Sequence, residues 1–447
     1  MLFVKKIKTT MKRACFRIGL WYLWALIFQL GGFDAQENDL KYGKTPDKLF
    51  PYQKFQKAYK YHFVEPVQFY GAGRDKMAPD HLEEVRIGFL GPLEGSSLVP
   101  LGKQMLNGAT LALEQANAAG GYKDLPFTLM VHNDVGLWGA AANEVVKMDE
   151  EKVWAWLGSI DDIVSHVALR ATLKMEIMMV NTGDPDPTFT ETNIPWAIRV
   201  ISDDRQSGYA LATHIFEEKK HERVAVIRTN TRYGRGGIME YSGAAVRLGH
   251  PMMIEERFND GETDFSMQLA NIKRVSPDAI LIWANAKESA LILIQARKMG
   301  LEQPIYASDR IVSNEFIEIA GDLAEGIIST CPYNPLSPSK KLASFKSDYS
   351  ARFGIEPDVF AAHAYDGMNL IIDAIKKVGL NRVLIRDVLT DLNTFQGYEG
   401  VTGKIILDES WNDIGDIWMA EVKNGQFKFS PGPDLGKRSH SGKMVGY

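Results

Sequence analysis

The 447-residue sequence contains only two cysteines, Cys15 and Cys331. Two cysteines exclude a disulfide scaffold, and they exclude a metal site built from several thiolates. If the amino-terminal segment that contains Cys15 is removed, Cys331 is left alone and no intramolecular disulfide can form. We expect the fold to be held together by packing rather than by covalent cross-links.

Clustered positive charge is also missing from most of the chain. The net charge is −5, but residues 1–35 hold six basic side chains and one acid. The remaining 45 basic and 55 acidic residues give the rest of the chain a net charge of −10. Sequence-independent nucleic-acid binding needs clustered Lys and Arg against the phosphates, so no nucleic-acid partner is expected.

Common enzyme signatures are absent. The sequence has no Gly-x-x-x-x-Gly-Lys-[Ser/Thr] phosphate loop, no Gly-x-Ser-x-Gly nucleophile elbow and no His-Glu-x-x-His zinc motif. The nine His residues are scattered, and no pair has the spacing of metal ligands on one helix. Residues 232–237 (Arg-Tyr-Gly-Arg-Gly-Gly) lack the third glycine of a dinucleotide fingerprint, which favours a plain strand-to-helix turn. We predict a protein that is not an enzyme and that holds no cofactor and no metal.

Long apolar runs are confined to the amino terminus. Residues 18–30 are almost wholly apolar and follow a basic run, but thirteen residues are fewer than the roughly 20 that span a bilayer. This arrangement is typical of a secretory signal peptide. We predict a signal peptide over residues 1–35 and an exported, periplasmic protein, with a retained, uncleaved anchor as the alternative. No later segment reaches 18 uninterrupted apolar residues, so the body should be soluble.

Residues 36–84 form an aromatic-rich amino-terminal extension. They contain nine Phe or Tyr residues, whereas a flexible linker is rich in Gly and Ser. Two interpretations remain open. The extension either wraps onto the body and buries its rings, which we favour, or binds an additional protein partner.

From Val85 onward, strand patterns alternate with helix patterns of 10–15 residues, which predicts parallel βαβ units. Strands are expected at 85–90, 125–132, 153–157, 176–180, 197–200, 223–228, 252–258, 279–283, 304–307, 326–330, 403–407 and 416–429. Helices are expected at 101–118, 139–149, 162–174, 205–219, 236–248, 264–275, 287–299, 339–352, 360–378 and 382–391. The rhythm restarts after residue 200, so we predict an α/β fold of two doubly wound, Rossmann-like lobes. Lobe 1 is assigned to 85–200 plus 335–408, lobe 2 to 201–334 plus 409–430, and a flexible tail to 431–447.

Seven short motifs occur in a particular order along this α/β region. They are residues 87–92 (Ile-Gly-Phe-Leu-Gly-Pro), 108–121 (Gly-Ala-x-Leu-Ala-Leu-Glu-Gln-Ala-Asn-Ala-Ala-Gly-Gly), Asn133-Asp134, Tyr233-Gly234, 264–266 (Asp-Phe-Ser), 295–300 (Gln-Ala-Arg-Lys-Met-Gly) and 364–366 (Ala-Tyr-Asp). In their order and spacing, residues 85–429 resemble the type I periplasmic solute-binding proteins of the leucine/isoleucine/valine-binding family.

The resemblance implies two lobes joined by a three-crossover hinge, which close around a small polar solute. The solute would be an amino acid, an amide or a related compound, and it would be passed to the membrane permease of an ABC transporter. A soluble ligand sensor or regulatory subunit with the same fold is the alternative. The tail after residue 430 is polar and Gly-rich, which disfavours a single-chain receptor.

Ligands of open α/β sheets bind beyond the carboxyl ends of the strands. In lobe 1 this places Ser159, Asp161, Asp162, Gly183 and Asp184 near the ligand, and in lobe 2 it places Tyr233, Asn285 and Asp309 there. The resemblance implies that Ser159 and the backbone at Gly183 hold an amino acid's carboxylate. It also implies that Asp309 pairs with an ammonium group, by a charge-assisted hydrogen bond.

The acids of lobe 1 depart from the family pattern. Where relatives have a run of Ser and Thr, this sequence has Asp161 and Asp162. The two Asp residues either cap the following helix, or they face the ligand and disfavour a free carboxylate. The second interpretation predicts a cationic ligand, or an amide or polyol. Trp138 either covers such a ligand by a cation–π contact or is an ordinary packed aromatic residue. Arg310 either receives an anionic group or is paired or solvated.

Overall fold

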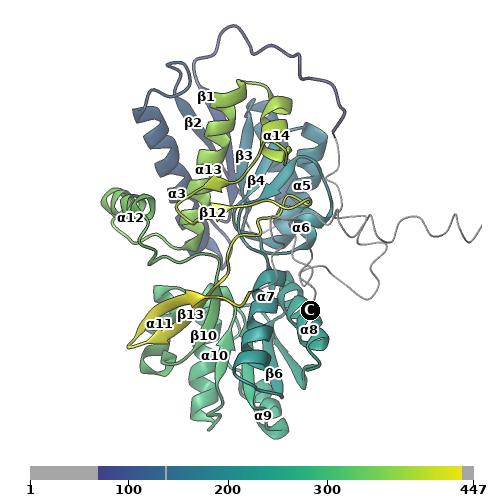
Figure 1. The fold of residues 1–447 in the computed structure, drawn as a ribbon, viewed down its shortest axis with the longest axis vertical. Helices are drawn as coiled ribbons and strands as arrows, with labels where there is room; N and C mark the ends of the chain where they lie inside the picture. The colour runs from purple at the N-terminus through teal and green to yellow at the C-terminus, as the bar shows by residue number, and fades with distance from the viewer. Residues whose placement is uncertain (1–68, 136–137, 435–447) are drawn as a thin grey trace, which may run out of the picture. The chain divides into compact units, whose positions relative to one another are not determined.

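The computed structural model describes residues 69–135 and 138–434 (Figure 1). The predicted signal peptide over residues 1–35 and the extension as far as residue 68 lie outside the described residues. So does the tail from residue 435 onward. The described part contains two larger β-sheets with helices on both faces, and one two-stranded sheet.

The first sheet is entirely parallel, with the strand order β2-β1-β3-β4-β5. Its strands are β1 (Val85–Gly91), β2 (Phe127–Asn133), β3 (Ala155–Gly158), β4 (Met178–Asn181) and β5 (Ala197–Arg199). The helices of this lobe are α3 (Val99–Ala118), α4 (Trp138–Glu150), α5 (Asp162–Met175), α6 (Thr188–Glu191), α12 (Lys340–Phe353), α13 (Val359–Val378) and α14 (Arg382–Thr390). Helices α3 and α13 pack closely because Gly108 has no side chain, and a Cβ there would lie 2.0 Å from the Ala361 carbonyl oxygen.

The second sheet has the order β14-β13-β10-β9-β8-β6-β7, and its last two strands along the chain run antiparallel to their neighbours. Its strands are β6 (Val224–Thr229), β7 (Ile254–Phe258), β8 (Ala279–Trp283), β9 (Ile305–Ala307), β10 (Ile328–Cys331), β13 (Trp418–Lys423) and β14 (Gln426–Pro431). Its helices are α7 (Asp204–Ala212), η4 (Thr213–Glu218), α8 (Arg232–Arg247), α9 (Ser266–Val275), α10 (Ala286–Lys298), η5 (Asp309–Ile311), α11 (Asn314–Ala320) and η6 (Gly321–Ala324). A small hairpin, β11 (Tyr398–Glu399) with β12 (Lys404–Ile405), belongs to neither sheet.

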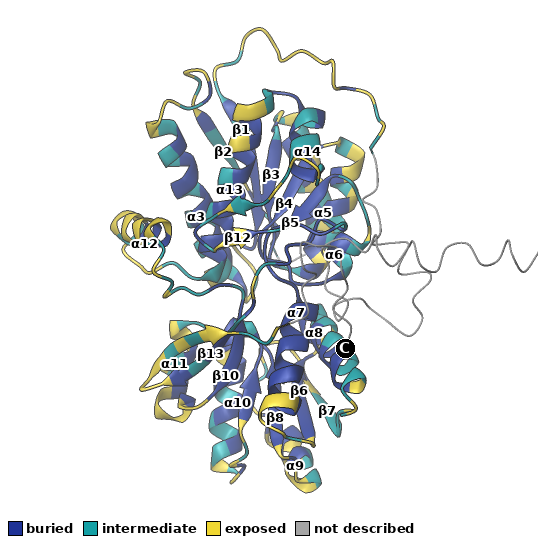
Figure 2. Cartoon of the chain, viewed as in Figure 1, coloured by how far each residue is buried: buried dark blue, intermediate teal, exposed yellow. Residues whose placement is uncertain are grey.

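The chain passes between the two sheets three times, through residues 200–203, 332–339 and 406–417 (Figure 1). Each sheet is buried between apolar faces of its helices, while the outer helix faces are exposed (Figure 2). The predicted fold class, two doubly wound α/β lobes joined by three crossovers, is confirmed. The segment after residue 334 returns to both lobes: α12, α13 and α14 pack in the first, and β13 and β14 extend the second sheet.

Some predicted elements differ from the structure. The helix predicted over 205–219 ends as α7 at Ala212 and continues as a π-helical turn, η4. The strand predicted over 416–429 is the hairpin β13–β14, which turns at Asn424 and Gly425, both with positive φ. Asn-Gly is a strong hairpin signal, so this turn was readable from the sequence. Helices α6 and α11 were not predicted because four and seven residues show too little periodicity.

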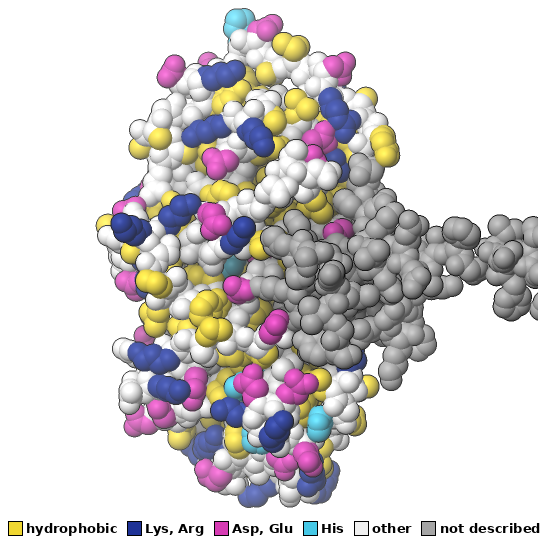
Figure 3. Space-filling view, viewed as in Figure 1, with side chains coloured by type: hydrophobic (Ala, Val, Ile, Leu, Met, Phe, Trp, Pro, Cys, Tyr) yellow, Lys and Arg dark blue, Asp and Glu magenta, His cyan; other side chains and the backbone are white. Residues whose placement is uncertain are grey.

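On the face displayed in Figure 3, Lys and Arg side chains of the described residues are interspersed with Asp and Glu. They do not gather into a basic stripe on this face. Among residues 69–135 and 138–434, no helix combines the length and the apolarity that crossing a membrane requires.

Residues 69–76 pack against the first lobe. The Phe69 ring meets the buried Trp196 ring edge-on, with 5.2 Å between the centroids. The Asn381 amide donates hydrogen bonds to the carbonyl oxygens of Gly73 (2.8 Å), Arg74 (3.3 Å) and Lys76 (3.0 Å). These contacts support the wrapping interpretation for this end of the aromatic-rich extension.

We expect the Asn381→Asp substitution to release residues 69–76 from the lobe without melting α14. The Asn381 Oδ1 atom accepts from the amides of Val383 and Leu384 at the helix start, and a carboxylate preserves this cap. It cannot donate to three carbonyl oxygens, so the segment should lose about 1–3 kcal/mol of local stability. Hydrogen exchange and limited proteolysis of 69–84 measure the release. Asn424→Asp at the exposed hairpin turn is the matched control, and unchanged protection in Asn381→Asp would contradict the prediction.

Candidate functional site

A cavity of about 370 Å³ lies between the carboxyl-end loops of the two sheets. We call it the interlobe cavity. Its lining comes from both lobes: Gly95, Ser96, Ser97 and Leu98 after β1; Asp161, Asp162 and Ile163 after β3; Asn230, Thr231, Arg232, Tyr233 and Arg235 after β6; Asp260 after β7; Asn285 after β8; and Arg310 after β9. Loops that follow parallel strands are where open α/β sheets bind ligands, and this cavity is the candidate functional site.

Adjacent acids at the start of α5 have different environments. Asp161 is the N-cap, and its Oδ1 atom accepts from the amides of Ile163 and Val164, each at 2.9 Å. The capping interpretation is confirmed for Asp161. Asp162, in the first helical turn, is 3% exposed, and neither of its carboxyl oxygens has a hydrogen-bond partner. Asp161 already accepts hydrogen bonds from the amides at the start of the helix. Asp162 lines the cavity, and its carboxyl group is left without a hydrogen-bond donor.

Tyr233, Asp309 and Arg310 form a compact cluster on the second lobe. Thr231 caps α8, and Gly234 leaves room for the Thr229 carbonyl oxygen, 2.1 Å from where a Cβ would stand. This turn directs the Tyr233 hydroxyl to Asp309, to which it donates at 2.9 Å. The Arg310 guanidinium stacks on the Tyr233 ring, 3.5 Å from its centroid.

Asn285 completes this cluster. Its Oδ1 atom accepts a 2.9 Å hydrogen bond from Arg310. The guanidinium is thus held against one wall of the cavity by a ring and an amide. Although burial alone would lower the pKa of Arg310, the nearby Tyr233, Asp162, Asp309 and Asp204 raise it.

Several carboxyl groups at this site are buried. Burial raises the pKa of Asp162 to about 7, although the charge of Arg310 opposes the rise. Burial also raises the pKa of Asp204 well above its usual range, and the charges of Asp309 and Asp162 add to the effect. The pKa of Asp309 is raised by burial too, against the opposing influence of Arg310 and the Tyr233 hydrogen bond. The site has more buried carboxyl groups than cationic partners to neutralise them.

The other residues predicted for lobe 1 lie beside the cavity rather than on its lining. Ser159 is fully buried and donates to Asp134 at 2.9 Å. Gly183 and Asp184 are buried in the loop after β4, where both amides donate to the Asn181 side chain. Trp138 begins α4, but its side chain lies outside what the structure describes.

Arg199 fixes the loop after β4 from inside the protein. Its side chain is completely buried, and it donates to the carbonyl oxygen of Asp186 (2.5 Å), to Asn412 (2.7 Å) and to Asp203 (3.0 Å). These partners belong to the loop and to two of the three crossovers. The position of Asp186 is thereby tied to the hinge.

Asp186 and its partners join the lobes beside the cavity. Arg232 of α8 donates from Nε to Asp186 Oδ2 (2.7 Å) and from Nη2 to Thr188 Oγ1 (3.1 Å), and its Nη2 lies 3.2 Å from His166 Nε2. We call this group the interlobe clasp. Burial alone would raise the pKa of Asp186, but hydrogen bonds from His166 and Thr188 and the charge of Arg232 hold it well below its usual range. The clasp therefore contains an ionised, buried carboxylate.

Sequence reasoning missed the polar loop residues Ser96, Ser97, Asn230, Thr231 and Asp260. All of them follow strands that were predicted, so the strand-end rule that found Asp162 and Tyr233 could have found them. Ser97 also bridges the lobes, because its hydroxyl donates to Asp260 at 3.2 Å. Arg232 was treated as part of a turn, and only the spatial proximity of the lobes reveals its role.

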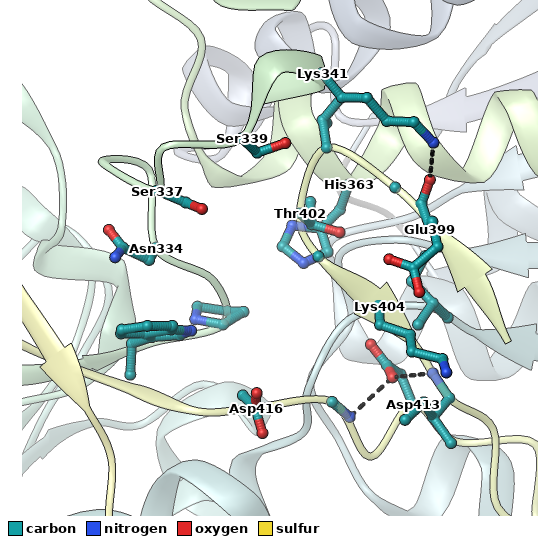
Figure 4. Close-up of a pocket in the computed structure, with 18 of the residues that line it drawn as sticks. Asn334, Ser337, Ser339, Lys341, His363, Glu399, Thr402, Lys404, Asp413 and Asp416 are labelled. Carbon is teal, nitrogen blue, oxygen red and sulfur yellow. Dashed lines mark hydrogen bonds between the residues drawn. The ribbon is translucent and has the colours of Figure 1, made fainter. Parts of the chain in front are cut away.

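A second, larger cavity of about 580 Å³ lies at the crossovers (Figure 4). Its labelled side chains come from the second and third crossovers, from α12 and α13, and from the β11–β12 hairpin. Lys341 donates to the Glu399 carbonyl oxygen (2.6 Å), and Asp413 accepts from the amides of Ile406 (3.0 Å) and Gly415 (2.9 Å). Burial lowers the pKa of His363 to about 4. These bonds hold together the segments around the cavity, whose lining also includes Pro332 and Asn334 after the carboxyl end of β10. Strand-end loops of both sheets meet only at the interlobe cavity among these two cavities, and the interlobe cavity is therefore the candidate site.

Within residues 69–135 and 138–434, no group of three or more His, Cys, Asp or Glu side chains is arranged to hold a metal ion. Cys331 is buried, and burial raises the pKa of its thiol to about 12. A thiol so shielded from solvent is a poor nucleophile.

Comparison with known proteins places the chain among transport proteins. The family model described as "Periplasmic binding protein" matches residues 84–426. The chain is 27% identical over 344 residues to the Leu/Ile/Val-binding protein homolog 2 of Brucella abortus, covering 77% of this chain and 91% of that protein.

Solved structures with the same fold are also solute-binding proteins. The branched-chain amino acid transporter substrate-binding protein LivJ of Streptococcus pneumoniae, in complex with isoleucine, has a TM-score of 0.71 and 25% identity, covering 78% of this chain and 100% of that one. The leucine-binding protein LivK of Thermotoga maritima has a TM-score of 0.70 and 26% identity, and the match covers 77% of this chain and 97% of that one. A solute-binding protein of R. palustris in complex with benzoate shares the fold, with a TM-score of 0.71 at 16% identity and 78% and 96% covered.

Proposed function

The chain belongs to the periplasmic binding protein family, and on that premise we propose that it captures a small polar solute between its lobes and delivers it to an ABC transporter permease. The interlobe cavity is the observation that carries this proposal, because both lobes supply polar groups to it. Its volume of about 370 Å³ lies toward the lower end of ligand pockets, which run from about 300 to 1,000 Å³. This size suits a metabolite such as an amino acid, an amide or a related compound.

The three crossovers support a hinge mechanism. Two lobes that are linked by a few short segments can close around a ligand by rotation at those segments. The interlobe clasp and the Ser97–Asp260 hydrogen bond form only when the lobes approach each other. Solute capture would thus consist of binding to the strand-end loops followed by closure.

The ligand contacts are part of the proposal. Asp162, Tyr233 and Asn285 line the cavity, Asp309 supports Tyr233, and Asp161 combines a lining position with its capping role. Ser159, Gly183 and Asp184 would act by shaping the loops behind the cavity. We retain the sequence-based lobe boundaries, the signal peptide over 1–35, the periplasmic location and a possible partner for residues 36–84 as further parts of the proposal.

Calorimetry and uptake together test the function. Purified protein is titrated with arginine, betaine, urea and leucine, and uptake of any solute that binds is compared in cells with and without the gene. We expect one class of solute to bind with 1:1 stoichiometry and its uptake to fall in the deletion strain. Binding with unchanged uptake would favour the soluble sensor or regulatory subunit, and no response to any solute would count against solute capture.

A further inference from the structure

The unsatisfied carboxyl group of Asp162 is unusual for a residue that is 3% exposed. A buried polar group normally has a hydrogen-bond partner, because leaving it without one costs free energy. Asp162 lines the interlobe cavity, and its neighbour Asp161 occupies the amides that would otherwise pair with it. The partner of Asp162 has to come from within the cavity.

A second carboxyl group is also buried without a hydrogen-bond partner. Asp204, at the start of α7, is 1% exposed, and neither of its oxygens has a hydrogen-bond partner among the described residues. Asp162 and Asp309 are close enough for their charges to act on it. Arg310 acts on all three acids, and Arg232, which is paired with Asp186 in the clasp, acts on Asp162 as well. Neither guanidinium donates a hydrogen bond to Asp162, so its carboxyl oxygens are left without a cationic hydrogen-bond donor.

Resting on the proposed function, we propose that the solute carries a compact cationic group with several N–H donors, and that this group binds Asp162 in the interlobe cavity. The group is an amidinium or guanidinium, whose N–H donors form a planar fork that matches a carboxylate. Its N–H donors satisfy the oxygens of Asp162 by charge-assisted hydrogen bonds.

A quaternary ammonium does not fit this site. Such a cation has no N–H to donate and is recognised by the faces of aromatic rings. Tyr233 is the aromatic residue among the described residues of the cavity lining, and Arg310 already covers its ring at 3.5 Å. The site should select arginine or agmatine over betaine, although all three carry a positive charge.

The charges around Asp162 predict that binding releases a proton. Asp162 faces Arg310 of η5, Arg232 of α8, Asp161 before its own helix, and Asp186 of the loop after β4. Asp184 of the same loop and Asp204 of α7 also act with it. Burial keeps part of the Asp162 population protonated near neutral pH in the empty cavity. As the pH increases toward 7, the affinity for a permanently charged guanidinium should therefore rise, by up to about tenfold for each pH unit.

Calorimetry of the full chain with arginine, agmatine, betaine and leucine tests the assignment. We expect arginine or agmatine to bind with 1:1 stoichiometry, more tightly at pH 8 than at pH 6, and betaine and leucine not to bind. Asp162→Asn, which preserves shape but removes the charge, should weaken binding at least about tenfold. Asp264→Asn, at an exposed acid before α9, is the matched control and should bind as the wild type does.

The outcomes separate the two proposals. Tight leucine binding without a response to the guanidinium ligands would overturn the cationic assignment and leave solute capture standing. Guanidinium binding that neither weakens in Asp162→Asn nor strengthens between pH 6 and 8 would also overturn it. The pH series uses the wild-type protein, so the test does not depend on whether the variant folds. No binding by any of the four ligands would count against both proposals.

Discussion

The Asp162→Asn variant should resist denaturant better than the wild-type protein at pH 8, and this advantage should shrink as the pH falls toward 4. Asp162 is buried beside the interlobe cavity without a hydrogen-bond partner, and its pKa is raised to about 7. In the unfolded chain its pKa returns to about 3.9. The folded, empty protein therefore holds a proton that the unfolded chain has released.

The direction and size of the change in unfolding free energy with pH follow from proton linkage. Below about pH 4 the carboxyl group is protonated in both states, and its titration does not affect the free energy of unfolding. Between about pH 4 and 7 only the unfolded chain ionises, so rising pH destabilises the wild type. Above pH 7 the full cost is reached, about 4 kcal/mol for a shift of about three pKa units. Asn does not titrate, so the stability difference should grow by up to this amount between pH 4 and 8.

Chemical denaturation at pH 4, 6 and 8 measures this difference. Asp264→Asn serves again as the control and should differ from wild type by a nearly constant amount, because hydrogen bonds from Ser266 lower the pKa of the exposed Asp264, and its titration then lies below this pH range. A difference between Asp162→Asn and wild type that is constant across the pH range would show that Asp162 is not buried unpaired in the empty protein.

This prediction and the ligand assignment describe one trade-off. Asp162 would destabilise the empty protein above neutral pH and bind a cation in the loaded one. Functional sites commonly contain groups that reduce stability. The combination expected for Asp162→Asn, higher stability with weaker guanidinium binding, would distinguish a ligand-binding residue from one that only supports the fold.

Most of the fold could be predicted because burial leaves a clear pattern in the sequence. Strand β8 was placed at its observed residues, since Ala279–Trp283 is a continuous apolar run that is buried on both faces. The end of α7 could not be predicted because the apolar pattern continues through η4, and only the backbone hydrogen bonds change. The β13–β14 hairpin was missed although its Asn-Gly turn was readable.

The site was predictable as a set of loops but not as a set of contacts. The strand-end rule found Asp162, Tyr233 and Asn285, because it depends only on where the strands end. It could not tell that Asp161 caps the helix while its neighbour is left unpaired, since this depends on the backbone angles of one turn. Nor could it show that Ser159 donates to Asp134, because these residues follow different strands.

Arg232→Met should weaken solute binding about 30- to 150-fold, through the interlobe clasp. Arg232 reaches from α8 to Asp186, which is 4% exposed, and its loss leaves that carboxylate without its cationic partner. Removing one partner of a buried ion pair costs about 3–5 kcal/mol. The Arg232 side chain is about a third exposed, so we expect a smaller cost of about 2–3 kcal/mol.

This cost should fall on the closed form alone. When the lobes separate, Asp186 regains water and needs no partner from the second lobe. A ligand that binds the closed form loses apparent affinity in proportion to the population of that form. Calorimetry should therefore show weaker binding, and small-angle scattering should show a more open protein at sub-saturating solute.

A double-substitution cycle separates the clasp from other effects of Arg232. Adding Asp186→Asn to Arg232→Met removes the unpaired charge, so the double variant should recover part of the affinity. Arg257→Met is the matched control, because Arg257 pairs with Glu255 within the second lobe, at 3.1 Å, and should leave affinity unchanged. Wild-type affinity in Arg232→Met would show that the clasp does not stabilise closure. A double variant with no recovery would show instead that Arg232 acts through the cavity it lines, by contacting the solute directly.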